Sequence, residues 1–224
     1  MKISFRKKSL IGFLLLLVQA AVAFGQQKPD ALAAYRAGRD LENAGRMADA
    51  EIKYSEAIQI CMDEINSQAS TMDTYAVLTW TLQRQKKYNE VISRGQEALR
   101  IIADYRVIET MGEAYFYLNN FPAALASMQR YANQLPNGDR APTAYFFIGE
   151  IYRYQKKYNY ADIAYTTALQ LAPGMSLWWY RLGTVREAVG DNRYAQDAYE
   201  RALKIDPEYT QARDGLARVK RDRA

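Results

Sequence analysis

The stretch PTAYFFIGEIYRYQKKYNYADIAYTTALQLAP, from Pro142 to Pro173, decides the fold because the chain repeats it. The following stretch, SLWWYRLGTVREAVGDNRYAQDAYERALKIDP from Ser176 to Pro207, aligns with it without a gap. Self-similarity at a spacing of 34 residues is typical of an array of small stacked units. Such an array implies further copies of this unit elsewhere in the chain.

Each copy has the pattern of two amphipathic helices joined by a short turn. Small and apolar residues recur every three or four positions on both sides of the Lys156-Lys157 pair, as helices require and strands do not. Proline then stops the second helix, since proline cannot continue the backbone ladder. The stops are at Pro136, Pro173 and Pro207.

Earlier parts of the chain contain three more units. They begin near Ala31, Met72 and Tyr105, and a partial unit begins at Thr210. The intervals leave about seven extra residues at Ile65–Thr71 and about three at Asn137–Ala141. The predicted organisation is five units near 31–64, 72–104, 105–138, 142–175 and 176–209, followed by a capping helix over 210–224.

Small residues recur at fixed places in these units. Gly38, Gly112, Gly149 and Gly183 occupy one place in the first helix. The absence of side-chain bulk there lets the paired helices approach closely, and large residues fill the remaining volume. The large residues are Tyr54, Tyr165 and Tyr199.

The repeated pattern resembles that of the tetratricopeptide repeat (TPR) family. It consists of an aromatic residue followed by Ile148-Gly149, Tyr152, Ala161, Tyr165, Ala168 and Pro173. The resemblance extends over about residues 31–224. Unit two departs from it at Thr79, Val91 and Gly95, and unit three has Tyr131 where alanine is usual. The resemblance implies an all-α fold: a right-handed superhelical array of antiparallel helix pairs, with first helices on the concave face and a C-terminal capping helix. In that cap, Ala212, Leu216 and Val219 are expected to face the array and Arg218 to face water.

Residues 1–25 have the pattern of a secretory signal peptide. Lys2, Arg6, Lys7 and Lys8 precede an apolar run of about 14 residues, and Ala21-Val22-Ala23 is a small-residue cleavage site. Cleavage after Ala23 or after Gly25 fits, leaving 26–30 as a short leader. An uncleaved anchor is the alternative, although the run is shorter than the roughly 20 residues that span a bilayer. We expect a periplasmic or secreted protein with no transmembrane span after cleavage.

Composition excludes several chemistries within this chain. It has no histidine and one cysteine, Cys61, so it lacks the residues for a structural zinc site, an internal disulfide or a histidine-dependent nucleophile. The four N-terminal basic residues lower the net charge from +5 to +1 when removed, which disfavours nucleic-acid binding. We expect no enzyme activity, no cofactor and no bound metal.

In this family the concave groove receives residues from fixed places on the first helices. The residues at the equivalent places of this sequence predict a groove that spans units two to four. They include the aromatic and arginine residues that typically anchor interfaces. The predicted binding residues are Tyr35, Arg39, Trp80, Arg84, Arg106, Tyr117, Arg153 and Tyr154. Glu109, Glu113 and Glu150 share this face; a cation site is one interpretation, and a solvated charged surface is the favoured one.

Two function classes follow. The first is an exported adaptor or scaffold that binds a protein or extended peptide, in envelope assembly or secretion. The second is an accessory subunit of a solute-binding or transport system with a pocket for a small apolar ligand. Both rest on analogy with exported TPR proteins.

Overall fold

The computed structural model describes residues 29–222, and this part of the chain is entirely helical apart from its connections. The predicted signal peptide, residues 1–25, and most of the leader lie outside the described residues. Eleven helices occur between 29 and 222. Their bounds are α2 Ala31–Asn43, α3 Met47–Asn66, α4 Met72–Arg84, α5 Tyr88–Leu99, α6 Tyr105–Tyr117, α7 Phe121–Gln134, α8 Ala141–Tyr154, α9 Tyr158–Leu171, α10 Ser176–Ala188, α11 Asn192–Ile205 and α12 Thr210–Arg221.

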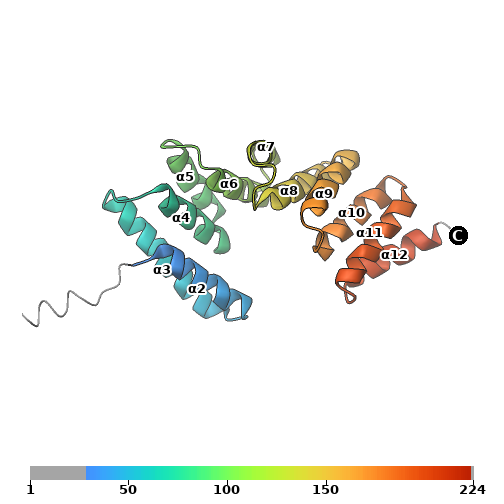
Figure 1. Cartoon of the computed structure of the whole chain (residues 1–224), viewed down its shortest axis with the longest axis horizontal. Helices are drawn as coiled ribbons and strands as arrows, with labels where there is room; N and C mark the ends of the chain where they lie inside the picture. The colour runs from blue at the N-terminus through green and yellow to red at the C-terminus, as the bar shows by residue number, and fades with distance from the viewer. Residues whose placement is uncertain (1–28, 223–224) are drawn as a thin grey trace, which may run out of the picture.

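Consecutive helices form antiparallel pairs that follow one another along a curved path from α2 to α12 (Figure 1). Each second helix also packs on the first helix of the next pair. The first helices touch one another as well: α2 packs on α4, α4 on α6, α6 on α8 and α10 on α12. The first helices therefore lie together on the inner face, as the fold class predicts.

One backbone motif ends all five first helices. At the end of α2, the Gly45 N–H donates to Glu42 O and the Arg46 N–H donates to Leu41 O, the pair of bonds of a Schellman cap. The motif needs a left-handed residue, and φ is +74° at Gly45 and +80° at Gly190. Lys86, Asn119 and Lys156 take the same conformation at equivalent turns. The turns inside the five helix pairs thus share one geometry.

Glycine and a large residue fit together inside most pairs. A Cβ added to Gly149 in α8 would lie 2.6 Å from the Tyr165 ring of α9, and one added to Gly183 in α10 would lie 2.5 Å from the Tyr199 ring. Both tyrosine rings are fully buried. The glycines are therefore needed for close helix approach, as the sequence pattern predicts.

The pair α4 and α5 departs from this arrangement in a compensated way. Thr79 stands at the glycine place and donates its hydroxyl to Tyr75 O at 2.9 Å. Gly95 stands at the place of the large residue, and the space that it leaves is filled by Met111 of α6. The side-chain volume that Gly95 leaves empty in α5 is thus filled by Met111 of the next unit.

The C-terminal helix α12 closes the array. Ala212 and Val219 are fully buried and Leu216 packs on the same cluster, as the sequence predicts. Arg218 differs from the expectation, since its guanidinium binds the Glu187 carboxylate of α10 at 2.8 Å instead of only facing water. Within residues 29–222, no helix combines the length and the apolar character that crossing a membrane requires.

Candidate binding groove on the concave face

The predicted binding residues fall into two groups on the first helices. The first group lies at the N-terminal end of the array, where the rings of Tyr35 in α2 and Trp80 in α4 pack with centroids 5.9 Å apart. The Arg84 guanidinium, one turn after Trp80, lies 3.7 Å from the Glu42 carboxylate of α2. Side chains of units one and two therefore meet across their boundary on the inner face.

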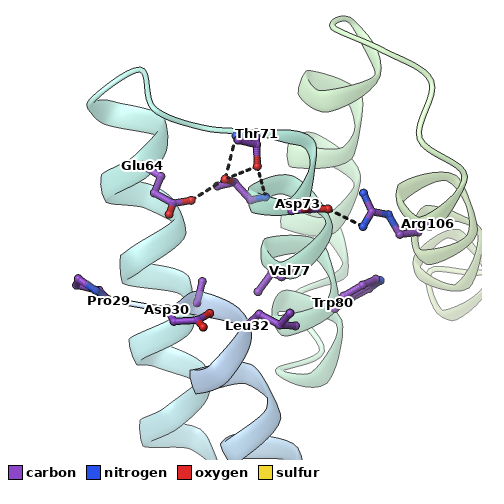
Figure 2. Close-up of a pocket in the computed structure, with 11 residues that line it drawn as sticks. Pro29, Asp30, Leu32, Glu64, Thr71, Asp73, Val77, Trp80 and Arg106 are labelled. Carbon is purple, nitrogen blue, oxygen red and sulfur yellow. Dashed lines mark hydrogen bonds and ion pairs between the residues drawn. The ribbon is translucent and has the colours of Figure 1, made fainter. Parts of the chain in front are cut away.

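A cavity of about 550 Å³ lies beside this first group (Figure 2). It lies where the starts of α2, α4 and α6 meet the end of α3. Trp80 and Arg106 line it, so the structure brings these two predicted residues to one hollow. The described residues that line it are Pro29, Asp30, Ala31, Leu32, Glu64, Thr71, Asp73, Thr74, Val77, Trp80 and Arg106.

Polar contacts hold one side of the cavity in place. Thr71 and Thr74 form a capping box at the start of α4, and the Thr74 hydroxyl donates to Glu64 Oε2 at 2.6 Å. Arg106 donates to Asp73 Oδ1 at 2.7 Å, and it also binds Asp104. The inserted segment Ile65–Thr71 thus contributes to the rim of the cavity.

The second group consists of Tyr117, Arg153 and Tyr154. Tyr117 of α6 stacks on Tyr88 of the preceding unit, with ring centroids 5.0 Å apart. Tyr154 of α8 stacks in the same way on Phe121, at 5.4 Å. The exposed fractions of Tyr117 and Tyr154 are 49% and 54%, so both rings keep much of their area for a partner.

Arg153 joins this second group through its neighbour. Its guanidinium carbon lies 4.5 Å from the centre of the Tyr154 ring, within cation–π range. It also forms an ion pair with Glu150 at 2.8 Å. Arg39 lies with neither group, and its nearest acidic partner is the adjacent Asp40 at 3.9 Å.

Acidic residues of the inner face are paired with arginines across unit boundaries. Glu109 of α6 is 2% exposed and accepts hydrogen bonds from Arg140 at 2.9 and 3.1 Å. Glu150 of α8 is 5% exposed and pairs with Arg181 of α10 at 3.2 Å, besides its bond from Tyr165. The interpretation of Glu109 and Glu150 as charges on a solvated face is therefore wrong.

Burial has a clear electrostatic consequence at Glu109. Loss of water, together with repulsion from the Glu113 carboxylate, raises the pKa of Glu109 to about 8, and Arg140 opposes this shift. Arg140 also binds Glu113. The two carboxyl groups and the Arg140 guanidinium form one compact network between units three and four.

The sequence departure at Tyr131 accounts for the position of Arg140. The Tyr131 ring is buried, and its hydroxyl accepts the Arg140 backbone N–H at 3.3 Å. A Cβ on Gly138 would lie 2.7 Å from that hydroxyl, so the connection needs glycine to pass over the larger residue. The three inserted residues give the connection the length to do so, and they bring Arg140 over the two glutamates.

Cation binding at these carboxylates finds no support in the geometry, because arginines occupy them. In residues 29–222, no three acidic or cysteine side chains converge as a metal site would require. The inner face of the described residues therefore carries two aromatic groups, the cavity beside Trp80 and a series of ion pairs.

A model of the tetratricopeptide repeat matches residues 142–175 and 179–209, the two stretches in which the repeat is clearest. The helix pairs, their close packing and their stacking are those of such repeats throughout residues 31–221. The chain carries tetratricopeptide repeats at these two stretches, and its described residues have the fold of a tetratricopeptide repeat array. Its solved neighbours include YrrB, a TPR protein with an unusual peptide-binding site, at a TM-score of 0.56 and 18% identity over 86% of this chain and 94% of that one.

Two curated proteins are similar in sequence to this TPR chain. The human protein O-mannosyl-transferase TMTC1 is 25% identical over 180 residues, which are 80% of this chain and 20% of that protein. The putative cytochrome c-type biogenesis protein CcmH of Haemophilus influenzae is 27% identical over 223 residues, 94% of this chain and 43% of that protein. The chain thus spans less than half the length of either relative. Tetratricopeptide repeats are a scaffold for protein interactions.

Proposed function

We propose that this TPR protein is an exported adaptor that binds an extended segment of another protein in its concave groove. The observation that carries the proposal is the exposed aromatic surface of Tyr117 and Tyr154. Each ring is held by stacking on a residue of the preceding unit, so little side-chain freedom is lost when a partner covers it. Rigid aromatic rings that keep half their area exposed are typical anchors of interfaces.

The arginines of the groove support recognition of a polypeptide in a second way. Arg106 and Arg153 each donate to a carboxylate of the protein, which fixes the orientation of the guanidinium group, and Arg84 lies 3.7 Å from the Glu42 carboxylate. A fixed guanidinium keeps N–H groups for the carbonyl groups of an extended chain. Because carboxylates offset these charges, we expect added salt to weaken binding only modestly.

Export is part of this proposal. It rests on the signal-peptide pattern of residues 1–25 and on the similarity to CcmH, whose name refers to cytochrome c-type biogenesis. A role in assembling other exported proteins is consistent with both, and a noncatalytic role is consistent with the missing histidine.

A small-ligand pocket is the second candidate, favoured by the cavity beside Trp80. Its volume of about 550 Å³ falls within the roughly 300–1,000 Å³ of ligand sites. Four charged residues line it, however, and an apolar solute would strip water from them without replacing their hydrogen bonds. The peptide function is therefore better supported.

Photo-crosslinking in cells of the native host tests the proposal. A benzophenone amino acid replaces Tyr154 or Trp80 on the concave face, and Gln129 on the exposed side of α7 is the control position. We expect a discrete crosslinked protein from the concave positions only. Equal crosslinking from Gln129, or no protein adduct from either concave position, would contradict a groove-binding adaptor.

A further inference from the structure

The cavity between units one and two has one apolar side. Ala31 and Leu32 of α2 and Val77 and Trp80 of α4 form this side, and Val77 is only 4% exposed. Such a surface accepts an aliphatic stem or a small apolar side chain. The volume of about 550 Å³ leaves room for more than a single side chain.

The polar residues that line the cavity carry an excess of negative charge. Asp30, Glu64 and Asp73 contribute three carboxylates, and Arg106 is the one basic residue among the lining side chains that the structure describes. Arg106 is also bound by Asp104, which lies next to the cavity. The charge of Arg106 is therefore already matched by Asp73 and Asp104 together, and a negative field remains.

The three carboxylates have hydrogen-bonding capacity left. Asp30 Oδ1 accepts the Ala33 N–H, Glu64 Oε2 accepts the Thr74 hydroxyl, and Asp73 Oδ1 accepts from Arg106. In residues 29–222 the second oxygen of each has no hydrogen-bond partner. The three carboxylates belong to the ends of three different helices. Asp73 is turned toward Arg106, whereas Asp30 and Glu64 lie apart from it at the start of α2 and the end of α3 (Figure 2).

We propose that this cavity receives a basic residue, together with the apolar residue beside it, from an extended peptide segment. The inference rests on the proposed groove-binding function and names the chemistry that the first two units select. The ammonium or guanidinium group lies in the negative field of Asp30, Glu64 and Asp73 and donates to a free carboxylate oxygen there. Its aliphatic stem lies along Leu32 and Val77, and the Trp80 ring contacts both the stem and the charge.

An acidic or neutral segment fits this cavity less well. An acidic side chain would face three like charges, and a neutral one would cover carboxylate oxygens without supplying ionic hydrogen bonds. Charge complementarity therefore selects a basic residue, while the apolar side selects its neighbour.

Fluorescence anisotropy with the full chain and short labelled peptides tests the proposal. The peptides carry Arg-Leu, citrulline-Leu, Glu-Leu or Arg-Ser between flexible Gly-Ser flanks. Citrulline keeps the shape of arginine but has no charge. We expect Arg-Leu to bind about tenfold more tightly than citrulline-Leu, since hydrogen bonds to charged groups are the stronger ones. Glu-Leu is expected to bind weakest.

Protein variants locate the effect. The double variant Glu64→Gln/Asp73→Asn keeps an acceptor for Thr74 and for Arg106 but removes two charges. We expect it to lose most of the preference for arginine over citrulline. The matched control, Glu56→Gln/Asp197→Asn, removes two exposed charges from α3 and α11 and is expected to keep the preference. Thermal unfolding confirms that both variants remain folded.

The outcomes separate this inference from the groove function. Tyr154→Ala is expected to weaken all peptides alike while leaving the ratio of arginine to citrulline unchanged. Peptides that bind with no preference for arginine would overturn the inference and leave the groove function standing. Free arginine amide that binds as tightly as the Arg-Leu peptide would show a small-cation site and would also overturn it. If no peptide binds at all, both proposals fail.

Discussion

Replacing Gly149 by leucine tests the close packing of the helix pairs. Any Cβ at this place lies 2.6 Å from Cδ1 and Cε1 of Tyr165, closer than real Cβ atoms approach. The ring has no room to swing away, because it is fully buried and its hydroxyl binds Glu150. The helices α8 and α9 must therefore separate, or the ring must leave its site.

The magnitude follows from two opposing terms. A side chain at 149 gains about 1 kcal/mol because it is a better helix former than glycine. Overpacking a filled core costs about 1–3 kcal/mol, and leucine adds three more carbon atoms to the clash. We expect Gly149→Ala to be mildly destabilising and Gly149→Leu to lose about 2 kcal/mol, the upper overpacking cost less the helix-propensity gain. A loss of that size lowers the melting temperature of a chain this long by about 4–8 °C.

Circular dichroism during heating and during urea unfolding measures the effect. The control is Gly174→Leu in the connection before α10, where an added Cβ meets no atom within 4 Å. Combining Gly149→Ala with Tyr165→Leu gives the ring's contribution, and the double variant is expected to be less destabilised than the sum of the single ones. A melting temperature for Gly149→Leu equal to that of the wild type would refute the packing argument.

Three further predictions concern other parts of the chain. Burial raises the pKa of folded Glu109 to about 8, whereas the pKa of the unfolded side chain is near 4.5. The free energy of unfolding should therefore fall as the pH rises from about 4.5 to about 8, because the folded state binds the proton more tightly. No histidine titrates there, and Glu109→Gln should flatten the slope in urea unfolding at several pH values; an unchanged slope would contradict the assignment. Cys61 is fully buried and burial raises the pKa of its thiol to about 12, so iodoacetamide should label it only after denaturation, and a disulfide-linked dimer on a nonreducing gel would disprove this. N-terminal sequencing of exported protein should find a start between residues 24 and 26, and intact Met1 in a membrane fraction would favour an anchor.

The repeat architecture was predictable because its determinants are local and recur in the sequence. One unit cannot bury its own apolar stripe, so copies at a fixed spacing indicate stacking. The glycine at 149 and the tyrosine at 165 show their relation through recurrence at 183 and 199. The turns were predictable for the same reason, although lysine at 86 and 156 adopts a left-handed conformation that usually favours glycine.

The ionic network of the inner face was not predictable in this way. Arg140 lies in a connection and meets Glu109 from 31 residues away, so neither periodicity nor helix position points to the pair. The signal that was present is indirect: Tyr131 at an alanine place, beside an inserted segment. A larger residue and a longer connection occur together because one makes room for the other.

The cavity was also only partly visible in the sequence. Trp80 and Arg106 were predicted for the groove from their helix positions. Asp30 and Glu64 were not, because they come from the ends of other helices and reach the cavity only through the stacking of units. The long insertion at Ile65–Thr71 was the sequence feature that pointed to this end of the array.

The affinity of the native partner, once identified by crosslinking, for concave and convex variants tests the account most directly. Trp80→Ala and Tyr154→Ala alter the groove, while Lys53→Ala and Gln129→Ala alter polar side chains of the second helices α3 and α7. Calorimetric titration should show losses of about 2 kcal/mol or more for a groove hot spot and little change for the convex pair. If the Lys53 and Gln129 replacements weaken binding more than the aromatic ones, the partner does not bind in the groove.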